Sequence, residues 1–206
     1  MSEREENGIV NWPGVPPRQG LYDPQFEHDS CGVGFVVDIK GRKSNRIIQQ
    51  ALTVLKNLLH RGACGCDPNT GDGAGILIQM PHAFLSRECA RLAIPLPGPR
   101  QYGAGLVFLP RDPSRAARCQ ELFARIIEEE GQALLGWREV PTDDSPVGPT
   151  ARSVEPHFKQ IFIGRHPDLT DDQAFERRLY VIRKRVEHAI WGSEMPERKF
   201  FYLPSL

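Results

Sequence analysis

Cys31 lies where the composition of the chain changes from polar to apolar. Cys31 follows 30 residues that are rich in polar side chains and proline, and it begins the short apolar run "CGVGFVVDI". On composition alone, a cysteine that begins a β run is more often a core residue than a nucleophile. A cut before Cys31 would change this, because it would free an α-amine with a pKa of about 7.7–8.0 beside a thiol with a pKa of about 8.5. One residue would then supply both a nucleophile and its base.

A second group of candidate residues lies in "HRGACGCDPNTGDGAG", which begins at His60. Arg61 precedes Gly62, so a helix that ends here would place the guanidinium at a turn. There it could bind a carboxylate or brace a loop beside the nucleophile. The alternative is that Arg61 is a helix-end cation that interacts with the terminal carbonyl groups.

The same segment contains a C-x-C pair, Cys64 and Cys66, for which Cys89 and either His60 or His82 would be the remaining metal ligands. Structural zinc sites usually show two spaced pairs of ligands. The second pair is missing here, so we predict no metal site. A C-x-C metal-binding protein is kept as an alternative.

The elements that must position these residues follow from hydrophobic periodicity. Residues 31–39 predict a strand, because the run is rich in valine and is followed by the turn signal "KGRKSN". Residues 45–62 predict an amphipathic helix with apolar residues at three- and four-residue spacing, ending at Gly62. The glycine-rich loop after this helix leads into another predicted strand, residues 76–80.

The rest of the chain alternates between helical and β patterns. We expect helices over residues 86–94, 114–131 and 170–190, and strands over residues 102–110, 134–140 and 158–165. Glycine turns and a mixed order of strands and helices favour an α+β sandwich over a doubly wound parallel sheet.

Composition sets bounds on the function. Twenty-six basic residues balance twenty-six acidic ones, so charge predicts neither nucleic acid nor a membrane surface as a partner. No apolar run approaches the roughly 18–20 residues of a membrane span, and the N-terminus lacks a secretory signal, so we expect a cytoplasmic protein. Five cysteines, an odd number, predict reduced thiols.

Four stretches together resemble a known family. They are "HDSCGVGFVVDIKG", "LKNLLHRGACGCDPNTGDGAGILIQMP", "LLGWREVP" and "KFFYLPSL". They are similar to the start of the glutamate synthase large subunit, which is a class II glutamine amidotransferase domain and an N-terminal-nucleophile (Ntn) hydrolase. The resemblance covers nearly the whole chain, including the segment before Cys31.

The resemblance implies a four-layer αββα sandwich, of which this chain would hold an incomplete part. Residues 1–30 would be a propeptide, and residues 31–206 the N-terminal part of the amidotransferase domain. Cys31 would be the catalytic nucleophile, with its freed amine as the base, and Arg61 would bind the substrate. The implied reaction is hydrolysis of L-glutamine to glutamate and ammonia, for transfer of the ammonia to 2-oxoglutarate.

The resemblance also implies partners and cofactors outside this chain. We expect no cofactor here, and FMN and an iron-sulfur cluster in the full-length enzyme. The partners would be the remaining synthase domains, with a small subunit or ferredoxin as electron donor. The family's oxyanion hole uses an Asn-Gly pair, whereas the only such pair here is Asn7-Gly8. We therefore expect a truncated chain that is a poor glutaminase or inactive by itself, and the alternative is a non-catalytic remnant or partner-binding module.

Overall fold

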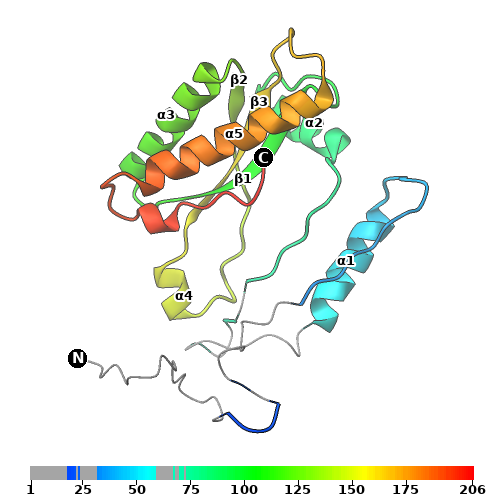
Figure 1. The fold of residues 1–206 in the computed structure, drawn as a ribbon, viewed down its shortest axis with the longest axis vertical. Helices are drawn as coiled ribbons and strands as arrows, with labels where there is room; N and C mark the ends of the chain where they lie inside the picture. Colours follow the sequence, from blue (N-terminus) through cyan, green and yellow to red (C-terminus); the bar gives the residue numbers. More distant parts are fainter. Residues whose placement is uncertain (1–17, 22, 24–31, 59–66, 68–69, 72) are drawn as a thin grey trace. The chain divides into compact units, whose positions relative to one another are not determined.

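The computed structural model describes residues 18–21, 23, 32–58, 67, 70–71 and 73–206. The chain divides into two compact units (Figure 1). The first unit consists of Met1–Ala63 and Ala74–Ile76, and the second of Cys64–Gly73 and Leu77–Leu206. Within the described part of the chain, no helix has the length and apolar character needed to cross a membrane.

The first unit contains helix α1, Asn45–Asn57. The Ser44 side chain caps its N-terminus by accepting a hydrogen bond from the Ile47 N–H. Leu58 follows as the C-terminal cap. The predicted amphipathic helix is confirmed over these residues, and its predicted end at Gly62 lies outside the described part.

The segment before α1 is not the predicted strand. Residues 32–39 belong to no strand of the described structure, and they lie against α1 instead. A Cβ built on Gly34 would stand 2.6 Å from Val54 Cγ1, so the absence of a side chain lets this backbone lie on the helix. A strand needs a neighbouring backbone with which to exchange hydrogen bonds, and the neighbour here is a helix. The strand predicted over residues 76–80 is also wrong, since these residues lie outside any described strand.

The second unit is built on a three-stranded antiparallel sheet. Its strands are β1 (Tyr102–Leu109), β2 (Ala133–Glu139) and β3 (His157–Gly164), in the order β1-β3-β2. A bulge between Leu134 and Gly136 adds one residue to β2. All three strands predicted from the sequence for this region are confirmed.

Helices α3 (Pro113–Glu129) and α5 (Asp172–Trp191) cover one face of this sheet (Figure 1). The side chains of Asp112 and Asp171 cap their N-termini. Both helices pack apolar side chains against alternate residues of the strands, and this contact forms the main core. Its largest fully buried members are Phe123, Phe201, Leu109, Ile127, Ile161, Ile163, Ile182, Ile190, Leu203 and Val107.

The opposite face of the sheet carries a smaller core under helix α2, His82–Arg91. Leu85 and Cys89 of this helix pack with Tyr102 and Phe162 of the strands. Two short elements complete the unit, helix α4 (Pro149–Ser153) and the 3-10 turn η3 (Arg198–Phe200). The α+β class is confirmed. The four-layer Ntn sandwich stays a prediction, because the described strands form a single sheet.

Candidate active site

The two residues singled out by the sequence, Cys31 and Arg61, both lie outside the described residues, as do Cys64 and Cys66. Their immediate chain neighbours in the first unit are described. Gly32 follows Cys31, and a Cβ built on it would stand 3.0 Å from Leu58 Cδ2. Leu58 is the C-terminal cap of α1 and precedes Arg61 by three residues. The structure therefore brings together the chain that leaves Cys31 and the chain that leads to Arg61.

Two residues that follow Arg61 in the chain are bound to helix α4 within the second unit. Asp67 Oδ1 accepts from Thr150 Oγ1 at 3.0 Å, and Asp67 Oδ2 accepts from the Ala151 N–H at 3.1 Å. The Gly148 N–H donates to Thr70 Oγ1 at 3.0 Å. Sequence reasoning missed Asp67 and Thr70, because their partners lie far away in the chain. The local sequence holds one sign of this contact. Gly148 precedes Pro149 at the start of α4, and a glycine there cannot cap the helix with its own side chain.

The described cysteines have no nucleophilic character. Cys89 and Cys119 are free thiols with no exposed surface. Burial raises the pKa of both thiols, that of Cys119 to about 11. Since the thiolate is the reactive form, neither residue is suited to attack a substrate.

The C-x-C metal site is not tested by the structure, because Cys64, Cys66 and His60 lie outside the described residues. Of the other two proposed ligands, Cys89 is packed in the smaller core, and His82 Nδ1 lies 3.1 Å from the Tyr102 hydroxyl. Among the residues that the structure describes, no three His, Cys, Asp or Glu side chains gather closely enough to hold a metal ion.

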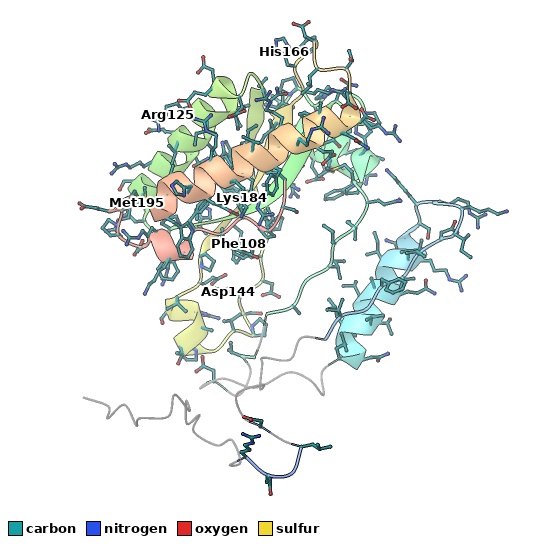
Figure 2. All side chains as sticks on the ribbon, viewed as in Figure 1. Phe108, Arg125, Asp144, His166, Lys184 and Met195 are labelled. Carbon is teal, nitrogen blue, oxygen red and sulfur yellow. The ribbon has the colours of Figure 1, made fainter. Side chains whose placement is uncertain are left out.

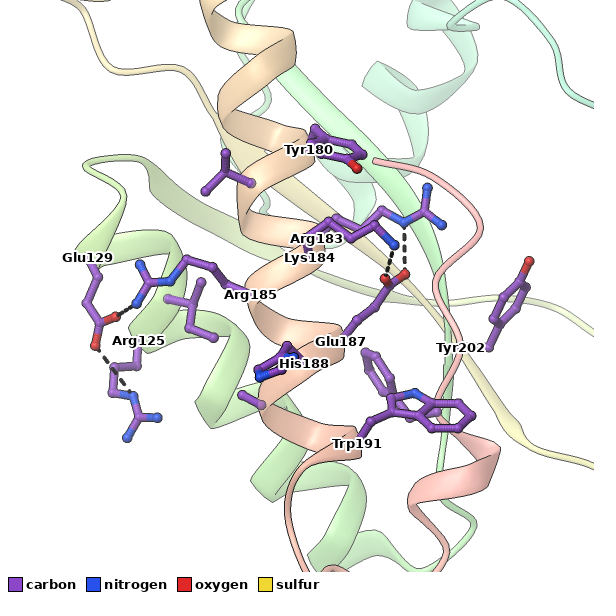
Figure 3. Close-up of a pocket in the computed structure, with 14 residues that line it drawn as sticks. Arg125, Glu129, Tyr180, Arg183, Lys184, Arg185, Glu187, His188, Trp191 and Tyr202 are labelled. Carbon is purple, nitrogen blue, oxygen red and sulfur yellow. Dashed lines mark hydrogen bonds and ion pairs between the residues drawn. The ribbon is translucent and has the colours of Figure 1, made fainter.

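A surface pocket of about 960 Å³ lies on the outer side of α5 (Figure 3). All of its lining residues come from α3, α5 and the segment Phe201–Tyr202. Three aromatic side chains there, Tyr180, Trp191 and Tyr202, are more than half exposed. No cysteine, serine or threonine lines it. The pocket offers a surface for binding.

The basic side chains of this pocket are paired with carboxylates. Glu187 accepts hydrogen bonds from Arg183 Nε at 2.9 Å and from Lys184 Nζ at 2.7 Å (Figure 3). Burial raises the pKa of Glu187, but the two hydrogen bonds outweigh burial and hold the pKa below its usual value. On the α3 side, Arg125 and Arg185 both pair with Glu129. The described cations of this pocket are thus engaged with carboxylates of the same chain. Figure 2 shows Arg125 and Lys184 among the other side chains of this unit.

Comparison with known proteins places this arrangement in a family. The sequence model of the class-II glutamine amidotransferases matches residues 31–206, and its match begins at Cys31. The chain belongs to the class-II glutamine amidotransferases. This confirms the resemblance seen in the sequence.

The curated relatives are glutamate synthases. The chain is 44% identical over 192 residues to the glutamate synthase [NADPH] large chain of Bacillus subtilis, covering 93% of this chain and 12% of that protein. It is 40% identical over 212 residues to glutamate synthase [NADH] of Schizosaccharomyces pombe, covering 99% of this chain and 10% of that protein. For the ferredoxin-dependent glutamate synthase 1 of Arabidopsis thaliana, the identity is 35% over 185 residues, with 87% and 11% covered. The chain thus spans about a tenth of the length of these relatives.

Proposed function

We propose that this chain forms the glutaminase part of a glutamate synthase and hydrolyses L-glutamine to glutamate and ammonia. Residues 1–30 are removed as a propeptide, Cys31 is the nucleophile, its freed α-amine is the base, and Arg61 binds the substrate carboxylate. The contact of Gly32 with Leu58 carries this proposal, because it joins the chain neighbours of both residues in one unit. The family match supports the choice of substrate.

The chemistry follows from a thiol and an amine on one residue. The amine takes the proton of the Cys31 thiol, and the thiolate sulfur attacks the side-chain amide carbon of glutamine. The C–N bond of the resulting tetrahedral intermediate breaks as nitrogen takes up the proton, and ammonia leaves. Water then attacks the thioester carbon, which releases glutamate and restores the thiol. The oxyanion of each intermediate needs hydrogen-bond donors.

The later steps belong to the longer polypeptides that the relatives represent. Their names specify NADPH, NADH or ferredoxin, and we propose that ammonia passes to 2-oxoglutarate in domains that carry FMN and an iron-sulfur cluster. The described residues do not fit such a cluster, because Cys89 and Cys119 are buried in two separate cores. An iron-sulfur cluster needs several thiolate ligands at one place. We also propose a cytoplasmic location.

The test is the pair of variants Cys31→Ser and Cys119→Ser in the natural polypeptide that contains these residues. We expect Cys31→Ser to abolish release of glutamate and ammonia from L-glutamine, whereas Cys119→Ser retains it. Intact mass of the active protein should show that residues 1–30 are absent. Hydrolysis that survives Cys31→Ser, or an active protein that retains these residues, would contradict the proposal.

Arg61 is tested separately through the substrate. Arg61→Lys keeps the charge but loses the two-pronged geometry that matches a carboxylate. We expect the KM for L-glutamine to rise while kcat changes less. An unchanged KM would assign Arg61 to the end of the helix instead.

The second candidate function is a partner-binding module without catalysis. The pocket on α5 favours it, because exposed Tyr and Trp side chains are typical of interface centres. This reading predicts that Cys31→Ser changes no activity and that Trp191→Ala weakens association with a partner domain. Cys31→Ser and Trp191→Ala together therefore separate the two functions.

A further inference from the structure

The outer face of α5 carries aromatic side chains among its charged residues. Tyr180 and Trp191 of this helix are 59% and 55% exposed, and Tyr202, which lines the same pocket, is 55% exposed. The outer face of an amphipathic helix is ordinarily polar, whereas tyrosine and tryptophan are enriched where proteins contact one another. This face therefore has the composition of a contact surface.

The aromatic groups on α5 are separated by a fixed length of helix. Tyr180, Lys184, Glu187 and Trp191 follow one another at intervals of four, three and four residues, which places them on one stripe (Figure 3). The eleven residues from Tyr180 to Trp191 rise by about 16 Å along the axis. An occupant that contacts both rings must have a similar length. A protein segment fits this requirement better than a small metabolite.

The charge of the pocket indicates the chemistry of the occupant. Apart from His188, four cations and two carboxylates line it, so positive charge is in excess. Each carboxylate is shared by two cations. An ammonium group has three N–H donors and a guanidinium has five, so the bonds to Glu187 leave donors on Arg183 and Lys184 for a further carboxylate. An acidic partner would complement this surface.

The length of the relatives indicates where such a partner would lie. The chain covers 12% of the Bacillus subtilis protein and 10% of the Schizosaccharomyces pombe protein, so most of each relative has no counterpart in it. Interfaces between domains of one polypeptide are more polar than permanent interfaces between subunits, which suits aromatic rings mixed with ion pairs. A bilayer fits less well, because its broad surface cannot enter a pocket.

We propose that the pocket on α5 docks an acidic segment of another domain of the natural polypeptide. Tyr180, Trp191 and Tyr202 pack against apolar side chains of that segment, and Arg183 and Lys184 bind its carboxylates. This docking does not depend on the glutaminase proposal, because all of its residues belong to the second unit.

The first test is hydroxyl-radical oxidation of the natural polypeptide, measured for each residue by mass spectrometry. Arg183→Glu/Lys184→Glu reverses the charge that attracts the acidic segment. The three aromatic side chains should be oxidised at least about fivefold faster in this variant than in the unmodified protein. The matched control is Arg87→Glu/Arg118→Glu, which changes the net charge equally at exposed positions outside the pocket. It should leave their oxidation unchanged.

The second test identifies the occupant by carbodiimide cross-linking, which joins an amine directly to a carboxylate in contact with it. We expect Lys184 to be joined to an Asp or Glu outside residues 1–206 of the same polypeptide. A mixture of nitrogen-14 and nitrogen-15 protein distinguishes links within one polypeptide from links between copies. Trp191→Ala keeps every charge but removes an anchor, so the yield of this link should fall at least about threefold.

Other occupants would give different results, and each would overturn the proposal. A link between nitrogen-14 and nitrogen-15 chains assigns the surface to a second copy, and a link to a different protein assigns it to a separate partner. Protection that appears only with vesicles containing phosphatidylserine assigns it to a membrane. A Lys184 link to Glu187 alone shows that no acidic segment contacts this lysine.

The oxidation experiment can also overturn the proposal. If Tyr180, Trp191 and Tyr202 of the unmodified natural polypeptide are oxidised at the rate of half-exposed rings, no domain covers them. If their protection survives the charge reversal, the occupant is not held through acidic groups. Lys184→Gln removes one charge without adding repulsion, so it serves if the double variant does not fold. It should give intermediate oxidation, and unchanged oxidation would contradict the docking.

Cys31→Ser separates this docking from the glutaminase proposal. The substitution should abolish glutamine hydrolysis and leave the oxidation of the three aromatic side chains unchanged. Surviving hydrolysis contradicts the glutaminase proposal alone, and unprotected aromatic side chains contradict the docking alone.

Discussion

Arg138 Nη2 of β2 lies 3.3 Å from Glu88 Oε2 of α2, and the Arg138 side chain is only 10% exposed. The guanidinium also lies over the Phe84 ring, 5.6 Å from its centre. Removal of Arg138 takes away this ion pair and the packing of the side chain on Phe84, and it leaves Glu88 with the exposed Arg91 alone. We expect Arg138→Ala to lower the free energy of unfolding by about 2–4 kcal/mol, measured by urea denaturation.

Arg91 provides a matched control, because it pairs with the same Glu88 at 2.9 Å but is 74% exposed. An exposed pair contributes little, so Arg91→Ala should cost less than about 0.5 kcal/mol. If both variants lower the free energy of unfolding equally, burial of Arg138 does not determine the contribution of its ion pair.

The raised pKa of Cys119, about 11, predicts an inert thiol. At pH 8 only about one molecule in a thousand carries the thiolate, and the side chain has no exposed surface. Iodoacetamide should leave Cys89 and Cys119 unmodified in the folded protein and label both in denaturant, as read by peptide mass spectrometry. Labelling of either residue at the denatured rate under native conditions would contradict the buried cores.

The ion pairs of Glu130 with Arg178 and Arg185 should make the free energy of unfolding depend on pH. A hydrogen bond from Arg178 holds its pKa below the usual value of 4.5, with a further contribution from Arg185, against the opposing effect of burial. A carboxyl group with a lowered folded pKa stabilises the protein above its unfolded pKa, and this stability is lost as pH falls through the folded pKa. Glu130→Gln should therefore cost about 1–2 kcal/mol at pH 7 and nothing at a pH below the folded pKa.

The measurement is a series of urea titrations between pH 7 and pH 2.5. Glu121→Gln, at an exposed position of helix α3, which Glu130 caps, serves as the control. A difference between Glu130→Gln and the unmodified protein that does not shrink with falling pH would rule out this role of the ion pairs.

Gly103 and Gly105 of β1 differ in the atoms that a Cβ at each position would meet. A Cβ on Gly105 would stand 2.4 Å from the Ser205 carbonyl oxygen, whereas one on Gly103 would meet the terminal methyl groups of Leu179. A backbone atom cannot rotate away as a methyl group can. We expect Gly105→Ala to destabilise by about 1–3 kcal/mol, more than Gly103→Ala. The reverse order of melting temperatures would contradict this assignment.

Local patterns in the sequence were sufficient for helices α1, α3 and α5 and for the three strands of the sheet. Their apolar residues recur at the spacing of the element itself, as at Leu179, Ile182 and Val186 of α5, which are all buried. The same alternation is present in residues 33–39, yet no strand forms in the described structure. A strand depends on a partner backbone, and the local sequence carries no information about that partner.

Some residues of the candidate site could be identified from local sequence, and others could not. Cys31 and Arg61 were identified from their positions at changes of pattern, and their roles stay predictions. Asp67 could not be identified, because its contact with Ala151 joins residues 84 positions apart. Gly148 begins α4 without a capping side chain, and the local sequence does not show which distant residue supplies one.

The backbone of residues 32–39 turns Gly32 and Gly34 toward α1, which leaves the apolar side chains of this segment exposed to solvent. Val33, Phe35, Val37 and Ile39 are between 67% and 100% exposed, in the alternating pattern that stacks readily into intermolecular sheets. Lys40 follows directly and opposes such stacking by charge repulsion, whereas the charge of Arg42 is paired with Asp38 at 3.0 Å. Salt screens that repulsion, so wherever this row is uncovered, aggregation should accelerate with ionic strength.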